Sequence, residues 1–113
     1  MQRIFVETTG FTKEISNISN GPELLQGIQN FLLLNFEAGD VIQGTGGIRK
    51  FRFKDPSRQK GSRGGLRILY LDLPERELLF LLVVYSKGTK DDISTADKKQ
   101  LRALAGILKG KEI

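Results

Sequence analysis

The sequence predicts a single α+β domain in which helices pack on one face of an antiparallel or mixed sheet. Three observations support this fold. Apolar residues with helical spacing follow a short β-rich segment near the N-terminus, β-rich segments fill the middle of the chain, and a capped amphipathic segment lies near the C-terminus. The expected element order is β–α–α–β–β–β–α. A length of 113 residues suits one domain, spanning residues 1–113.

The N-terminal half predicts one strand and two helices. Residues 3–7 (RIFVE) are rich in β-forming side chains and predict a short strand. Apolar residues between positions 11 and 18 then recur at helical spacing, which predicts a helix ending near Asn20. Pro22 suits the first turn of a second helix, and the broad apolar stripe over 24–36 predicts that this helix faces the core.

The C-terminal half predicts three strands and a final helix. Residues 35–47 are glycine-rich and irregular, and the strands are expected at 48–54, 66–73 and 77–86. Only three residues separate the last two strands, which predicts a hairpin. Ser94, followed three residues later by an aspartate, resembles a capping box and predicts the start of the last helix.

The composition excludes several kinds of chemistry. The chain has no cysteine, which rules out disulfides, zinc–thiolate sites and thiol nucleophiles and favours a cytoplasmic location. It also has no histidine, the usual side chain for proton transfer near neutral pH. Proton transfer must therefore use lysine, arginine, tyrosine or carboxylates. No apolar run approaches the roughly 20 residues that cross a bilayer, so we expect a soluble protein with no membrane partner.

Positive charge is concentrated in the middle of the chain. The net charge of the whole chain is +5. One short stretch holds a single acid, Asp55, among eight bases: Arg49, Lys50, Arg52, Lys54, Arg58, Lys60, Arg63 and Arg67. A concentrated basic surface stabilises a nearby polyanion, whereas a charge that serves solubility would be spread over the chain. The cluster therefore indicates a phosphate-bearing ligand.

Strand alternation places part of this cluster on one surface. In a strand over 48–54, Lys50, Arg52 and Lys54 point to one side, and Phe51 and Phe53 point to the other. We expect the two phenylalanines to face the core. The three cations then form a row on the opposite face of the sheet.

The next two strands are expected to extend this row. Arg67 lies on the second strand and could join the cations, and Tyr85 and Lys87 reach the end of the row from the third. Like charges held close together repel unless an anion neutralises them. The sequence therefore predicts an anion site built from several strands.

Three stretches of the chain resemble the HigB branch of the RelE/ParE superfamily of bacterial toxins: GDVIQGTGGIRKFRF, GGLRILYLDL and LLFLLVVYSKGTKDDIS. The resemblance implies a small RelE-like fold and a ribosome-dependent endonuclease that cuts mRNA in the ribosomal decoding site. It implies three partners, namely the ribosome, mRNA and a cognate antitoxin, expected to be of the helix-turn-helix type. It implies a type II toxin–antitoxin system with no cofactor.

The residue types suit metal-independent RNA cleavage of this kind, in which a 2′-hydroxyl loses a proton and attacks the adjacent phosphate. Arg52 and Arg67 are the candidates for stabilising charge on the phosphate oxygens. Neighbouring cations favour the neutral form of a lysine, and Lys50 is the candidate base. Lys87 is the candidate acid for the leaving oxygen. Tyr85 is expected to hydrogen-bond the phosphate or stack on a base.

Further basic residues are expected to hold the RNA backbone without taking part in the chemistry. These candidate RNA-binding residues are Lys54, Arg58, Lys60, Arg63 and Lys90. Neither a metal nor an organic cofactor is required by this scheme.

Two other functions are compatible with the sequence. A ParE-like toxin would share the fold and inhibit DNA gyrase through protein contacts, without an assembled nuclease site. A nucleic-acid-binding module without catalysis would satisfy the basic cluster alone. Cut transcripts would indicate the nuclease, and DNA damage signalling would indicate the gyrase inhibitor. RNA binding without growth inhibition would indicate the binding module.

Overall fold

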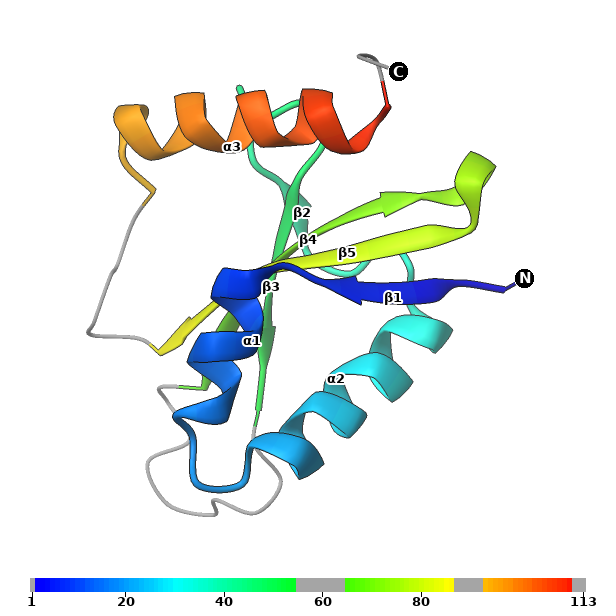
Figure 1. The fold of residues 1–113 in the computed structure, drawn as a ribbon, viewed down its shortest axis with the longest axis vertical. Coiled ribbons are helices and arrows are strands. Elements are labelled where there is room, and N and C mark those ends of the chain that lie inside the picture. Colours follow the sequence, from blue (N-terminus) through cyan, green and yellow to red (C-terminus); the bar gives the residue numbers. More distant parts are fainter. Residues whose placement is uncertain (1, 55–64, 87–92, 111–113) are drawn as a thin grey trace.

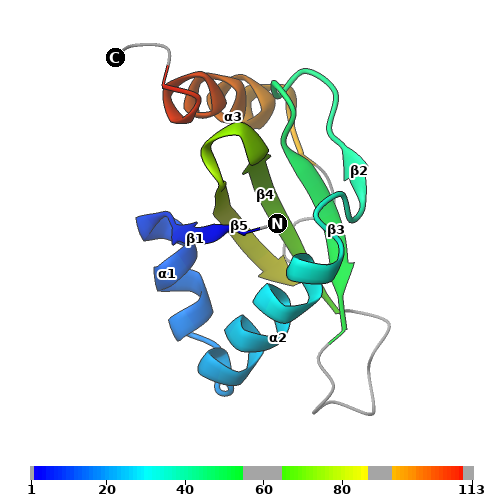
Figure 2. The ribbon, with the colours of Figure 1, turned by 90° about the vertical axis from the view of Figure 1, so that its right-hand side faces the viewer.

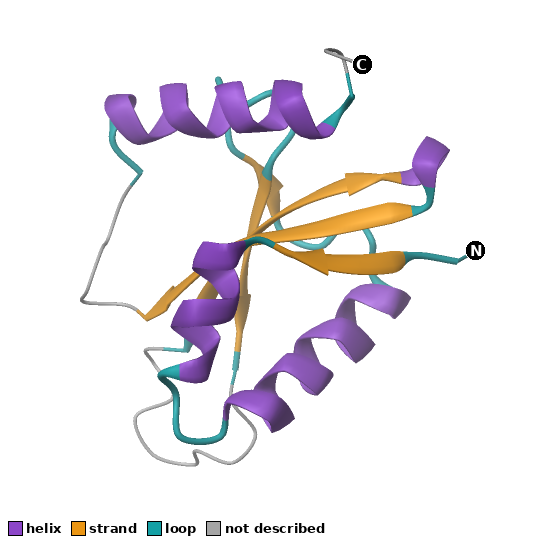
Figure 3. Ribbon diagram, in the orientation of Figure 1, coloured by secondary structure: helices purple, strands orange, loops and turns teal. Residues whose placement is uncertain are grey.

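The computed structural model describes residues 2–54, 65–86 and 93–110 and confirms an α+β fold (Figure 1). The elements, in chain order, are β1 (Ile4–Glu7), α1 (Thr9–Ser16), α2 (Gly21–Leu34), β2 (Asp40–Val41), β3 (Arg49–Phe53), β4 (Leu66–Leu73), the 3₁₀ turn η1 (Pro74–Arg76), β5 (Leu78–Ser86) and α3 (Thr95–Leu108). Figure 3 shows the same elements coloured by type. None of the helices in these three ranges combines the length and apolarity needed to span a bilayer.

The five strands form one mixed sheet in the order β1-β5-β4-β3-β2, which Figure 2 shows from left to right. β1 runs parallel to β5, and the other neighbouring strands are antiparallel. The predicted hairpin is β4 and β5, joined through η1. β2 is an additional strand that the sequence does not predict, because two residues are too few to show a pattern.

The first helix is shorter than expected and ends at Ser16 rather than near Asn20. The chain then makes a turn, in which the N–H of Gly21 donates to the carbonyl of Ile18. At Gly21 the backbone lies so close to the carbonyl oxygen of Ile15 that a Cβ atom would clash. The glycine thus permits α2 to begin immediately beside α1.

Two apolar clusters lie on opposite faces of the sheet. α1 and α2 pack together on one face, where their buried side chains meet alternate strand residues such as Phe51, Ile68 and Tyr70. The neighbouring residues Leu69 and Leu71 point the other way and pack with α3. Figure 1 shows the sheet between α3, at the top, and the pair α1 and α2, at the bottom. α3 thus covers part of a second face, in addition to the one that the sequence predicts to be covered.

A β-bulge in β5 changes which side chains face each helix layer. The pairing with β4 steps from Leu69–Val83 to Tyr70–Leu81, which leaves Leu82 as an extra residue. Leu82 and Val83 consequently both join the cluster beneath α3. Beyond the bulge the alternation is shifted by one residue, so Val84 enters the core beneath α1 and α2.

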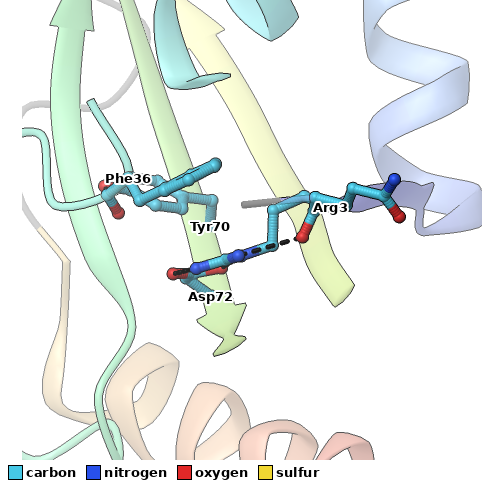
Figure 4. A network of polar contacts seen from close by, with 5 residues as sticks. Arg3, Phe36, Tyr70 and Asp72 are labelled. Atoms are coloured by element: carbon cyan, nitrogen blue, oxygen red, sulfur yellow. Dashed lines mark hydrogen bonds and ion pairs between the residues drawn. The ribbon is translucent and has the colours of Figure 1, made fainter. Parts of the chain in front are cut away.

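A polar network ties the N-terminal strand to the centre of the sheet (Figure 4). The Arg3 guanidinium donates to both carboxylate oxygens of Asp72, at 2.6 and 3.1 Å, and its central carbon lies 3.9 Å from the Phe36 ring centroid. The Tyr70 hydroxyl lies 2.8 Å from the carbonyl oxygen of Ala38 and 3.1 Å from that of Phe36. The network therefore fixes the segment that leaves α2 against both β1 and β4.

Candidate nucleic-acid interface

Three of the predicted site residues form a line across the sheet. Arg52 on β3 is directly opposite Arg67 on β4, and Arg67 is directly opposite Tyr85 on β5. Directly opposite residues have Cβ atoms about 4.5–5.5 Å apart and share a face of the sheet. The structure therefore brings Arg52, Arg67 and Tyr85 together on one surface. We call this line of Arg52, Arg67 and Tyr85 the cationic row. It crosses the strands and shares Arg52 with the row predicted along β3.

The cationic row lies on the face opposite α1 and α2. The residues that alternate with it, Phe51, Ile68 and Val84, are all buried in the core beneath those helices. Phe51 stacks on Phe31 of α2, with ring centroids 5.4 Å apart. This packing fixes the orientation of β3, so that Arg52 is exposed as the alternation predicts.

Tyr85 reaches the row because of the β-bulge. In a regular strand Tyr85 would share a face with Leu79 and Leu81, which are buried beneath α1 and α2. The extra residue moves Tyr85 to the face of Arg67, where it packs against the cluster beneath α3. Bulges commonly re-aim a side chain beside a functional site.

Lys50 lies two residues before Arg52 on β3, on the same face of the sheet. It is half-buried, opposite Leu69 on β4 and Asp40 on β2. The spacing of two strand residues puts Lys50 roughly 7 Å from Arg52 along the strand. Asp40 was not predicted as a site residue, because only the pairing of β2 with β3 places it opposite Lys50. Gly39, which has a positive φ, lets the chain pass very close to the Lys50 carbonyl there.

The remaining candidates divide into two groups. Lys54 directly follows β3 and is exposed. In the described part of the chain, Lys50, Arg52 and Lys54 form no ion pair. The other predicted residues lie outside the described ranges: Lys87, the candidate acid, and the candidate RNA-binding residues Arg58, Lys60, Arg63 and Lys90.

A pocket of about 290 Å³ lies beside the cationic row, between the sheet and the first half of α3. Its lining residues are Leu69, Val83 and Tyr85 from the sheet, Ile93 from the segment before α3, and Asp97, Gln100, Leu101 and Leu104 from α3. The sequence signals only the apolar part of its helical wall, Leu101 and Leu104, because Asp97 and Gln100 are polar and fit no apolar pattern. The pocket and the cationic row share Tyr85.

Both ends of α3 are fixed. At its start, the Ser94 hydroxyl accepts from the Asp97 N–H, and the Asp97 carboxylate accepts from the Ser94 N–H, which confirms the predicted capping box. At its end, the Arg76 guanidinium donates to the Leu108 carbonyl, a favourable place for a cation. Lys109 also donates to the carbonyl of Gly46, at 2.6 Å. The helical wall of the pocket is therefore held in place.

The arrangement can bind an anion on the row and a flat, largely apolar group in the pocket. Two guanidinium groups side by side offer planar pairs of donors that match phosphate oxygens. Within the described ranges, no cluster of three or more Asp, Glu, His or Cys residues could hold a metal ion. The sequence matches no model of a known protein family.

Proposed function

We propose that this chain is a ribosome-dependent mRNA endonuclease, the toxin of a type II toxin–antitoxin pair. The observation that carries the proposal is the alignment of Arg52, Arg67 and Tyr85 on neighbouring strands, with Lys50 on the same face. The resemblance of the sequence to the HigB branch of the RelE/ParE toxins supports the same function. Cytoplasmic mRNA on the ribosome is the proposed substrate, and a cognate antitoxin the proposed inhibitor.

The proposed reaction is an internal transfer at one phosphodiester. The 2′-oxygen forms a bond to phosphorus as its proton passes to Lys50, and the bond from phosphorus to the 5′-oxygen breaks. Arg52 and Arg67 neutralise the charge that builds on the phosphate oxygens. Lys87 returns a proton to the 5′-oxygen. The products are a 2′,3′-cyclic phosphate and a 5′-hydroxyl end.

The distance along the sheet between the proposed base and the two arginines supports this reaction. A base must reach the 2′-hydroxyl rather than the phosphate oxygens, and Lys50 is offset from the Arg52–Arg67 pair by two residues along the strand. Proton transfer by one positioned group contributes about 10²–10⁴-fold to the rate.

Mapping of transcript ends after brief expression tests the proposal. We expect translation to stop and new 5′-hydroxyl ends to appear within translated codons, and Arg67→Ala to remove both effects. Arg102→Ala is the matched control, since Arg102 is an exposed arginine on α3 outside the site. Intact transcripts together with DNA damage signalling would instead indicate a gyrase inhibitor. Tight RNA binding without cleavage would indicate a non-catalytic module.

A further inference from the structure

We propose that the pocket between α3 and the sheet binds one unpaired base of the RNA strand, and that Gln100 hydrogen-bonds the edge of this base. The inference rests on the proposed function, because it places the scissile phosphate on Arg52 and Arg67. It adds a specificity subsite to that function. The occupant is a single nucleobase next to the phosphate that is cut.

The position of the pocket agrees with such an occupant. Tyr85 belongs both to the cationic row and to the pocket wall, and Leu69, another wall residue, is directly opposite Lys50. Neighbouring strands are about 4.8 Å apart. A phosphate on Arg67 therefore lies one strand from the pocket. A base joined to that phosphate through its own ribose can enter the pocket without moving the backbone from the row.

The size and lining of the pocket also suit a base. A volume of about 290 Å³ is near the lower limit of about 300 Å³ for small-molecule sites, which suits one aromatic ring system rather than several. Most of the wall is aliphatic, and Tyr85 supplies an aromatic ring. Unpaired RNA bases are commonly bound by stacking on aromatic side chains.

Charge separates the two parts of the site. Asp97 is one of the lining residues of the pocket, and its negative charge disfavours a second phosphate there, whereas arginines form the neighbouring row. The neutral part of a nucleotide is thus directed into the pocket and the anionic part onto the row. Gln100 is exposed on the same face of α3, and its amide can both donate to and accept from a base edge.

Cleavage of defined messages in a reconstituted translation mixture tests the inference. The messages differ only in the bases next to the cut, and the 5′-hydroxyl ends are counted for each base. We expect the wild-type protein to prefer some bases and Gln100→Ala to reduce that preference by about tenfold. Gln26→Ala, on the exposed face of α2, is the matched control and should keep the preference.

The outcomes separate the inference from the function on which it rests. Equal cutting at all bases by the wild-type protein, or an unchanged preference in Gln100→Ala, overturns the base pocket and leaves the nuclease proposal standing. No cutting by the wild-type protein overturns both. Thermal unfolding of Gln100→Ala and Gln26→Ala, expected at the same temperature, shows that a changed preference does not come from a loosened α3.

Discussion

Arg52 and Arg67 are directly opposite each other on β3 and β4, with no intervening residue. Like charges directly opposite each other on neighbouring strands destabilise a sheet. This pairing brings two planar donor groups together. A bound anion that contacts both would lower their repulsion, and the phosphate of the proposed RNA substrate is such an anion.

Sulfate should stabilise the wild-type protein more than an Arg52→Gln variant. In dilute buffer we expect Arg52→Gln to be at least as stable as the wild type, by up to about 1 kcal/mol, because the repulsion is gone. Added sulfate should then raise the melting temperature of the wild type more than that of Arg52→Gln, because anion binding at the row adds to the general stabilising effect of sulfate. Circular dichroism at matched ionic strength, with chloride in place of sulfate, measures this difference.

An exposed arginine outside the row provides the control for the sulfate experiment. Arg102→Gln removes the same charge from α3 and should keep the full sulfate effect. An equal sulfate response in the wild type and in Arg52→Gln would contradict an anion site at the row.

Cleavage should depend on the shape of the Arg67 side chain as well as on its charge. Arg67→Ala is expected to lower the cleavage rate by about 10²–10³-fold, the usual loss when a donor to the transition state is removed. Arg67→Lys keeps the charge but not the planar pair of donors, so its rate should be intermediate. Single-turnover cleavage on programmed ribosomes measures both rates. Equal rates for Arg67→Lys and the wild type would reduce the role of Arg67 to charge alone.

Breaking the Arg3–Asp72 pair should destabilise the fold. The Arg3 side chain is 3% exposed and that of Asp72 is 14% exposed, so each charge relies on the other in place of water. The carboxylate raises the pKa of Arg3 above its ordinary value, chiefly through their hydrogen bond. We expect Asp72→Ala to lower the free energy of unfolding by about 1–3 kcal/mol, because the partly buried guanidinium keeps only its bond to the Gln2 carbonyl and its contact with Phe36.

A double-mutant cycle in urea tests this coupling. Once Arg3→Ala has removed the guanidinium, Asp72→Ala should cost much less than it does alone. Glu75→Ala, at an exposed position in η1, is the control and should change stability little. Additive effects of the two substitutions would show that the pair contributes no coupling energy.

Most elements of the fold could be predicted from the sequence because their patterns are local. The alternation of Phe51 and Phe53 with Arg52 depends only on the strand period, and the structure confirms it. The capping box at Ser94 is likewise a local signal, and it is confirmed. Elements with short-range determinants are therefore the ones that a single sequence predicts.

The features that the sequence did not predict depend on contacts between distant segments. Asp40 is placed beside Lys50 only by the pairing of a two-residue strand. The partnership of Arg3 with Asp72 joins residues that are 69 positions apart. The face occupied by Tyr85 depends on a bulge that leaves no local pattern. Each of these requires the sheet order, which periodicity alone does not supply.

The Tyr70 hydroxyl should make stability depend on pH in alkaline solution. The side chain is fully buried, and this burial raises the pKa of Tyr70 to about 12, with Arg49 opposing the rise and Asp72 adding to it. The folded state therefore favours the protonated phenol. The protonated phenol contributes fully to the free energy of unfolding below pH 10, the pKa of an unfolded tyrosine. This contribution is lost as the pH rises through 12. The loss could reach about 2–3 kcal/mol.

Tyr70→Phe isolates this effect because it keeps the ring and removes the ionisable group. At pH 7 we expect the variant to be less stable than the wild type by about 1 kcal/mol, since the hydroxyl no longer donates to the carbonyl of Ala38. Between pH 10 and 12 the wild type should lose this advantage and become the less stable protein, because its unfolded state ionises the phenol there while its folded state keeps the proton. Urea unfolding of both proteins across this range measures the difference, and parallel pH profiles would contradict a buried, protonated Tyr70.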